Sequence, residues 1–363
     1  MKGASRYFAE TYFEARDRFL EACRLRGVDV ASWRNPHPGP QGQPLYTDAA
    51  RIGPADARSV LVVQSGTHGV EGYAGSAIQL RWLSEGGDPP QGVAVVLVHA
   101  LNPYGFAWTR RYNEDNVDLN RSFLDHSKGD YPPNPGYEEL ARWIIPDEWT
   151  PHSRKAAEEA FDAYAAKHGE RAFMLALKMG QYDHPKGAYY GGRKETWSGA
   201  TVRAIATQFL DRAERAALID IHTGLGPFGY GDCLTTFSDV SKQGRRAIEW
   251  YGKVTCTKSE SSSYSSSGCT IIEGYTNAAP HLDWTPIGLE FGTWEPKDMR
   301  DAVRADGWLH AHGLPDHPQA KRIKAALRNA FYPGDPVWRS MVIERGEEIV
   351  ARGLVGLASA PKD

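Results

Sequence analysis

Four short, nearly uninterrupted apolar runs constrain the fold of this chain more than any other feature. They occupy residues 60–63, 93–98, 217–221 and 286–291 and are rich in Val, Ile and Leu. Runs with so little alternation are typical of strands buried on both faces, as in parallel or mixed sheets covered by helices. A helical stretch at residues 74–83 separates the first two runs. We therefore predict an α/β fold with a mixed, largely parallel, twisted sheet flanked by helices on both faces.

Two further segments have a helical pattern. Apolar residues at near-helical spacing over residues 5–26 predict an amphipathic opening helix that stops at Gly27. Residues 125–200 contain a proline-rich start and a charged, alanine-rich middle, which predict a mostly helical insertion packed beside the sheet. We expect one domain over residues 1–363 that carries this insertion.

Two loops are candidates to shape a binding site. The insertion ends in an aromatic and glycine-rich stretch around Tyr190, which we expect to border a cleft. The serine-rich patch at residues 259–267 predicts a surface loop, in which Ser263 and Tyr264 are further candidates.

Charge and composition exclude several classes of function. Lys and Arg total 42 against 45 Asp and Glu, a net charge of −3, and no long run of one sign predicts a nucleic-acid or anionic-membrane partner. The four cysteines lack redox or metal spacing, so we expect them to be reduced: Cys23, Cys233, Cys256 and Cys269. The N-terminus lacks a signal-peptide pattern, and no apolar span of ~20 residues follows it. We expect a cytoplasmic protein with a small, polar substrate, and the oligomeric state stays open.

Polar residues follow the apolar runs where each predicted strand ends. His68 and Glu71 follow the first run, Asn102 follows the second, His222 follows the third, and Glu290 closes the fourth. In open α/β sheets, ligands bind in the crevice outside the carboxyl ends of the strands. We therefore expect these residues to share one site.

His68, Glu71 and His222 form a two-histidine, one-carboxylate set. Catalytic zinc typically takes three protein ligands, of which His₂Glu is a recurring choice, and keeps a fourth position for water or substrate. Each histidine alone could equally be a hydrogen-bonded turn residue. Glu290 lies in an otherwise apolar strand, where a carboxylate is either a catalytic base or the partner of a neighbouring arginine.

The segment over residues 100–123 places several arginines on the predicted cleft side. Arg110, Arg111 and Arg121 lie among asparagines in this segment. The planar guanidinium suits bidentate contact with a carboxylate and stabilisation of a developing oxyanion. Arginine-rich loops are also often merely solvated, so these residues alone leave both readings open.

The order of these motifs resembles that in the zinc carboxypeptidase (metallocarboxypeptidase) superfamily, in a divergent bacterial-type branch. The matching motifs are His68-x-x-Glu71, Asn102-Pro103-x-Gly105, Arg111-x-Asn113, Val-Asp-Leu-Asn-Arg at residues 117–121, and the strand ends at His222 and Glu290. The stretch Asp220-x-His222-Thr223-Gly224 is more similar to the aspartoacylase and succinylglutamate desuccinylase relatives, which cleave N-acyl amino acids. The insertion has no counterpart that we can assign in the digestive carboxypeptidases.

The resemblance implies a role for each matching residue. One Zn²⁺ would be held by His68, Glu71 and His222, and Glu290 would activate the zinc-bound water. Arg111 would steady the oxyanion, although the adjacent Arg110, a further candidate for substrate binding, could take its place. Asn120 and Arg121 would grip the substrate carboxylate, and Tyr275, upstream of Asp283-Trp284, is similar to the mobile tyrosine that caps the substrate. Asp220 would either orient a metal ligand or cap a neighbouring turn.

The activity that follows from the resemblance is a zinc-dependent, metallocarboxypeptidase-like hydrolysis. Its substrate would be a small molecule or peptide with an amide bond adjacent to a free carboxylate. One alternative is an N-acyl amino acid deacylase on the same fold. Another is a zinc-binding module that has lost catalysis, which the presence of Glu290 and Arg111 disfavours.

Overall fold

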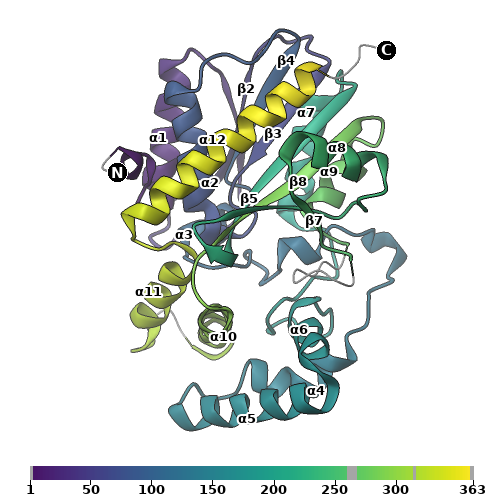
Figure 1. Cartoon of the computed structure of the whole chain (residues 1–363). Coiled ribbons are helices and arrows are strands. Elements are labelled where there is room, and N and C mark those ends of the chain that lie inside the picture. Colours follow the sequence, from purple (N-terminus) through teal and green to yellow (C-terminus); the bar gives the residue numbers. More distant parts are fainter. Residues whose placement is uncertain (1–2, 260–267, 314–315, 360–363) are drawn as a thin grey trace.

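The computed structural model describes residues 3–259, 268–313 and 316–359 (Figure 1). Its centre is an eight-stranded sheet in the order β1-β2-β4-β3-β5-β8-β6-β7. The strands are β1 (Val30–Arg34), β2 (Tyr46–Ile52), β3 (Ser59–Gln64), β4 (Val93–His99), β5 (Arg215–Phe228), β6 (Gly231–Thr235), β7 (Val254–Cys256) and β8 (Asp283–Gly292). Ser263 and Tyr264, expected to shape a binding site, lie outside the described residues.

The four predicted apolar runs form the central strands β4, β3, β5 and β8, which pair in parallel. Antiparallel pairs occur toward both edges, between β1 and β2, β2 and β4, and β6 and β8. In β3, Val60 and Val62 pack on one face of the sheet, whereas Leu61 and Val63 pack on the other. Both faces are therefore buried, which is why the sequence shows continuous apolar runs instead of alternation.

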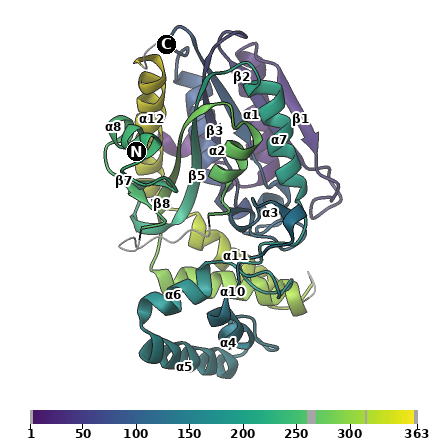
Figure 2. The ribbon, with the colours of Figure 1, turned by 90° about the vertical axis from the view of Figure 1, so that its right-hand side faces the viewer.

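Helices cover both faces of the sheet, as predicted. The α-helices of the described residues are α1 (Tyr12–Leu25), α2 (Gly72–Glu85), α3 (Pro103–Ala107), α4 (Pro135–Ile144), α5 (Pro151–His168), α6 (Glu170–Lys178), α7 (Trp197–Leu210), α8 (Lys242–Tyr251), α9 (Ile271–Ala278), α10 (Pro296–His312), α11 (Ala320–Phe331) and α12 (Pro336–Ser359). The apolar side chains of α1, α2, α8 and α12 share one core with the sheet, and those of α7 and α9 form the core of the opposite face. Figure 2 shows α12 and α7 on opposite sides of the strands. Among the described residues, no helix is both long and apolar enough to cross a lipid bilayer.

The predicted insertion is mostly helical and forms a third layer. In Figure 1, α4 and α5 lie at the lower end of the molecule, and α6, α10 and α11 lie between them and the sheet. Tyr137 of α4, Phe161 of α5 and Leu177 of α6 share an apolar core with Val303 of α10 and Leu327 of α11. This layer places the end of α6 at the carboxyl ends of the central strands.

The opening helix is shorter than the spacing predicts. A single 3₁₀ turn covers Ala4–Tyr7, and α1 begins only at Tyr12. The helix starts there because the Thr11 side chain accepts a hydrogen bond from Glu14 N at 3.1 Å, which caps the helix. The predicted stop is close to the observed one, since α1 ends at Leu25 and Gly27 has a φ of 68°, a backbone conformation that glycine adopts readily.

Candidate metal centre

The turn after β3 presents His68 and Glu71 side by side. His68 precedes a 3₁₀ turn over Gly69–Glu71, and α2 continues directly from it. The turn packs so closely on α3 that a Cβ atom at Gly69 would lie 2.1 Å from the backbone carbon of Gly105. A glycine is therefore required here, and the close contact fixes the position of the turn that carries both side chains.

His222 reaches the same place from β5. The sequence predicts that His222 follows the end of a strand, but β5 continues to Phe228, so this detail is wrong. The strand continues because His222 still pairs with Glu290 of β8. Its pairing with β3 ends at Asp220 opposite Gln64. Beyond that point no β3 backbone lies beside β5, which leaves room for the His222 ring to approach Glu71.

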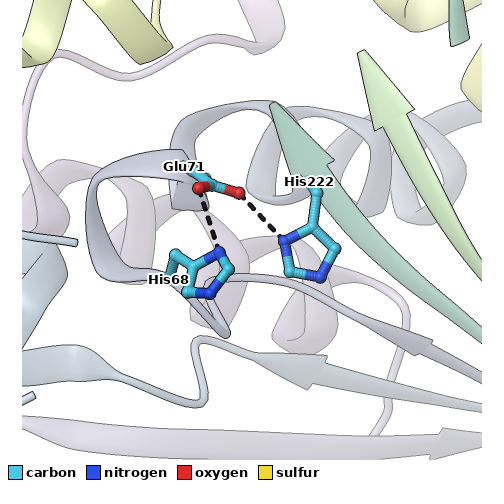
Figure 3. A group of neighbouring side chains, drawn as sticks. All are labelled: His68, Glu71 and His222. Atoms are coloured by element: carbon cyan, nitrogen blue, oxygen red, sulfur yellow. Dashed lines mark hydrogen bonds and ion pairs between the residues drawn. The ribbon is translucent and has the colours of Figure 1, made fainter. Parts of the chain in front are cut away.

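The side chains of His68, Glu71 and His222 converge (Figure 3). Nδ1 of His68 lies 3.0 Å from Oε1 of Glu71, and Nδ1 of His222 lies 2.9 Å from Oε2 of the same carboxylate. All three side chains are buried, and one potential ligand atom from each lies within 4.8 Å of the others. This group could hold a metal ion, so the histidines are not merely separate turn residues.

Two aspartates hold the far sides of the imidazole rings. Oδ1 of Asp118 lies 3.0 Å from Nε2 of His68. Oδ2 of Asp220 contacts Nε2 of His222, and its Oδ1 accepts a hydrogen bond from Thr67 Oγ1 at 2.6 Å. Metal-binding histidines usually donate their second ring N–H to such a carboxylate, which orients the other nitrogen toward the ion. Of the two roles expected for Asp220, the structure therefore supports orientation of His222.

The charges around these rings favour a bound cation. Burial alone would raise the pKa values of Glu71 and Asp118, but His68 and Arg111 hold both well below their usual range. Burial would lower the pKa of His222, yet Asp220 and Glu71 raise it well above its ordinary value. The site thus stabilises positive charge on this ring, and a metal ion can replace that proton.

The donor set fits zinc. Nδ1 of His68 is buried and lacks a hydrogen bond of acceptable geometry among the described residues, although it lies 3.0 Å from Glu71 Oε1. Two imidazole nitrogens and one carboxylate are a set that Zn²⁺ accepts in tetrahedral sites. His68, Glu71 and His222 are therefore the residues that would hold the ion.

Glu290 lies beside the metal ligands without an arginine partner. It is opposite His222 in the parallel register of β5 and β8, and its Oε1 accepts a hydrogen bond from Leu225 N at 3.0 Å. No ion pair joins Glu290 to an arginine among the described residues, so the structure does not support that alternative. Burial, together with the charge of Glu71, raises the pKa of Glu290 to about 7. A carboxyl group with a pKa near neutrality is suited to exchanging protons.

His68, His222 and Glu290 line a cavity of about 160 Å³ at the carboxyl ends of the central strands. Its cationic wall includes Arg111, Arg121 and Lys178, and its apolar wall includes Met299 and Phe331. A small ligand with both charged and apolar parts matches such a lining.

Arg111, Asn120 and Arg121 all line this cavity. Arg111 Nη1 lies 2.7 Å from Glu71 Oε1, and its Nε lies 3.3 Å from Asp118 Oδ2, which fixes the guanidinium next to the metal ligands. Asn120 Oδ1 accepts a hydrogen bond from Ile271 N at 2.9 Å. Its Nδ2 lies 3.4 Å from His222 Nε2, so the amide is held at the edge of the metal centre.

The structure does not bring Arg110 or Tyr275, both expected to contact substrate, to the cavity. The Arg110 side chain is buried away from the cavity, paired with Asp306 at 3.1 Å and hydrogen-bonded to Asn116. Tyr275 is fully buried in the core of one sheet face, where its hydroxyl donates to Gln64 Oε1 at 2.7 Å. A side chain packed in this way cannot act as a mobile cap. Neither residue lines the cavity.

The loop expected to border the cleft does so through Tyr189, whereas the nearly buried Tyr190 does not line the cavity. Asp118 and Lys178 also belong to the site, although the motifs did not point to them. Asp118 lies inside the conspicuous Val-Asp-Leu-Asn-Arg motif, which was a usable signal. Lys178 had no such signal, because its position depends on how the insertion docks.

A comparison with known families identifies the chain. The model of the family DUF2817, described as a protein of unknown function, matches residues 8–345. The chain belongs to DUF2817. A comparison with curated proteins found no match for this DUF2817 protein.

Solved structures similar to the DUF2817 chain include both groups that its motifs resemble. Bovine thrombin-activatable fibrinolysis inhibitor in complex with tick carboxypeptidase inhibitor is 12% identical, with 94% of this chain and 99% of that chain covered and a TM-score of 0.44. A metallo-carboxypeptidase from Burkholderia cenocepacia is 14% identical (93% and 70% covered, TM-score 0.38). The succinylglutamate desuccinylase from Chromobacterium violaceum is 16% identical (87% and 74% covered, TM-score 0.36). At these identities and TM-scores, the likenesses say nothing of this chain's substrate.

Proposed function

We propose that this protein is a zinc-dependent hydrolase that cleaves an amide bond adjacent to a free carboxylate. The observation that carries the proposal is the convergence of His68, Glu71 and His222 beside Glu290. His68, His222 and Glu290 line one cavity together with several cationic residues. When bound, a zinc ion supplies a Lewis acid that polarises a carbonyl oxygen and acidifies water. His68, Glu71 and His222 would hold it and leave a fourth position for substrate or water.

Glu290 is the proposed proton carrier. Its Oε1 is held by Leu225 N, which leaves Oε2 to take a proton from the attacking water. The water oxygen bonds to the carbonyl carbon, the carbon–nitrogen bond breaks, and Glu290 returns the proton to the leaving amine. A pKa of about 7 suits both transfers, because the carboxyl group can accept and release a proton near neutral pH.

Arg121 and Asn120 are the proposed contacts for the substrate carboxylate. Nε and Nη2 of Arg121 donate to the backbone oxygen of Lys178, and Nη1 donates to the backbone oxygen of Asn120. These bonds fix the plane of the guanidinium, and each terminal nitrogen keeps a second N–H for a ligand. No carboxylate pairs with Arg121 among the described residues, so its charge is available to substrate.

Arg111 has a different proposed role. Its contacts with Glu71 and Asp118 hold it close to the metal ligands, where negative charge develops on the carbonyl oxygen during the reaction. A fixed guanidinium stabilises such charge without reorganising at the moment of reaction.

Hydrolysis of N-acyl amino acids is a second candidate on the same site. The observation that favours it is the contact between Asp220 and His222 within the Asp-x-His-Thr-Gly stretch, the feature that resembles acylase relatives. An N-acyl amino acid and a peptide present the same amide and carboxylate to Arg121 and Glu290, so only the acyl side distinguishes them.

The test is turnover of a panel of C-terminally free peptides and N-acyl amino acids by zinc-loaded protein, with metal content measured in the same preparation. We expect hydrolysis that a chelator abolishes and zinc restores. Glu290→Gln should retain zinc but lower kcat by about 10²- to 10⁴-fold, because it removes the proton carrier and no metal ligand. Bound zinc without cleavage of any member of the panel would support a non-catalytic binding module instead.

A further inference from the structure

Two cations of the cavity have no acidic partner in the part of the chain that the structure describes. Arg111, Arg121, Lys178 and Arg300 all line it. Arg111 and Arg300 each pair with neighbouring carboxylates. Neither Arg121 nor Lys178 forms an ion pair within residues 3–259, 268–313 and 316–359. The proposed function uses the charge of Arg121 for one carboxylate of the substrate and leaves Lys178 unexplained.

Lys178 belongs to the same end of the cavity as Arg121. It is the last residue of α6, and its backbone oxygen accepts hydrogen bonds from Nε and Nη2 of Arg121. Its ammonium group also lies within electrostatic reach of Arg111 and Glu290. The insertion therefore contributes a second positive charge beside the one proposed to bind the substrate carboxylate.

A charge in this position is costly unless a ligand compensates it. Lys178 is half-buried, and removing an ammonium group from water without a partner is unfavourable. Burial and the nearby Arg111 lower the pKa of Lys178 to about 8, whereas Glu290 opposes this shift. The side chain therefore stays mostly protonated at neutral pH and retains its charge in the cavity.

We propose that Lys178 is a specificity-determining residue that binds a second carboxylate, carried by the same amino acid whose α-carboxylate contacts Arg121. This inference rests on the proposed function and names its substrate class: peptides ending in Asp or Glu, or N-acyl derivatives of these amino acids. We assign the second carboxylate to the leaving amino acid because Lys178 and Arg121 both line the cavity and are in contact through the Lys178 backbone oxygen. The acyl part of the substrate would then contact the apolar side chains that line the cavity, such as Met299 and Phe331.

Calorimetric titration of the zinc-loaded, full-length protein with glutamate and with glutamine tests this assignment. The two ligands have nearly the same shape and differ in the side-chain charge. We expect glutamate to bind the unmodified protein about 10- to 100-fold more tightly, the range of one charge-assisted hydrogen bond. Lys178→Met should reduce this ratio to near 1 while leaving glutamine affinity unchanged, and Lys178→Arg should keep most of the preference.

The control variant is Lys167→Met, which removes an exposed lysine of α5 in the same insertion and should leave both affinities unchanged. Equal binding of glutamate and glutamine to the unmodified protein would overturn the proposal. An equal loss of affinity for both ligands in Lys178→Met would also overturn it, because it would indicate a structural role through Arg121. A preference for N-succinylalanine over N-butyrylalanine that Lys178→Met abolishes, with the glutamate preference intact, would place the second anion on the acyl side and also overturn it. Because these titrations need no turnover, failure of hydrolysis would refute the proposed function separately.

Discussion

Asp118→Asn isolates the contribution of an orienting carboxylate to the metal centre. Asp118 is fully buried, and its oxygens contact His68 Nε2 at 3.0 Å, Arg111 Nε at 3.3 Å and Asn120 N at 3.0 Å. Asparagine has the same shape but no charge, and only one of its two terminal atoms accepts hydrogen bonds. The substitution therefore weakens the hold on the His68 ring without removing a metal ligand.

The expected loss follows from the charges involved. The pKa of Asp118 is held well below its usual range because, against the effect of burial, Arg111 and His68 stabilise its charged form. The aspartate is therefore fully ionised at neutral pH, and the variant loses a whole charge. Replacing a carboxylate that orients a metal-binding histidine typically weakens metal binding about 10- to 100-fold. That range corresponds to about 1.4–2.7 kcal/mol.

The assay is a competition titration of zinc between the protein and a chromogenic chelator at pH 7.5. Asp125→Asn is the matched control, because Asp125 Oδ1 accepts a hydrogen bond from Ser127 N, as Asp118 Oδ1 does from Asn120 N. Asp125 is exposed and contacts no proposed metal ligand, so its variant should bind zinc normally. If Asp118→Asn kept its fold and bound zinc within about threefold of the unmodified protein, the orienting role would be refuted.

Three further predictions concern acidity, substrate binding and folding. The raised pKa of Glu290 predicts that kcat/KM falls on the acidic side of neutrality, because burial favours the protonated form, which cannot accept a proton. Bound zinc moves this fall below pH 7, and a profile flat between pH 4 and 7 would contradict the assignment. Arg121→Ala should raise KM by about tenfold or more for substrates with a free carboxylate but leave esterified analogues unaffected, which steady-state kinetics on matched pairs would reveal. Gly69→Ala should lower the free energy of unfolding by about 1–3 kcal/mol, because the added Cβ meets the backbone of Gly105 at 2.1 Å. Denaturant titration against Gly334→Ala, where nothing lies within 4 Å, checks this, and equal stability of the two variants would disprove it.

The central strands and the candidate metal ligands could be predicted because both have signals in short stretches of the sequence. Continuous apolar runs indicate strands buried on both faces, and parallel strands bring their carboxyl ends to one edge of a sheet. His68, Glu71, His222 and Glu290 therefore meet although β3 and β8 are far apart in the sequence. Of the four central strands, β5 was predicted too short, because its pairing with β8 continues beyond His222.

The details that failed depend on tertiary packing. Arg110 and Arg111 are neighbours in the sequence, yet the first is buried against Asp306 while the second lines the cavity. No local pattern distinguishes two adjacent arginines. Tyr275 has the spacing expected of a capping residue, but α9 packs on the sheet and buries it completely. The contribution of Lys178 depends likewise on where α6 docks, which helical periodicity does not encode.

The hydrogen bonds from Arg121 to the end of α6 have a consequence for engineering this protein. A shortened chain that kept the eight strands but lacked the helical layer would lose the acceptor that aims this guanidinium. The same deletion would remove the apolar side chains of α4, α5 and α6 that pack against α10 and α11. Trimming to a minimal scaffold would therefore disable ligand recognition even if zinc still bound, so diversification is better directed at side chains of the layer than at its removal.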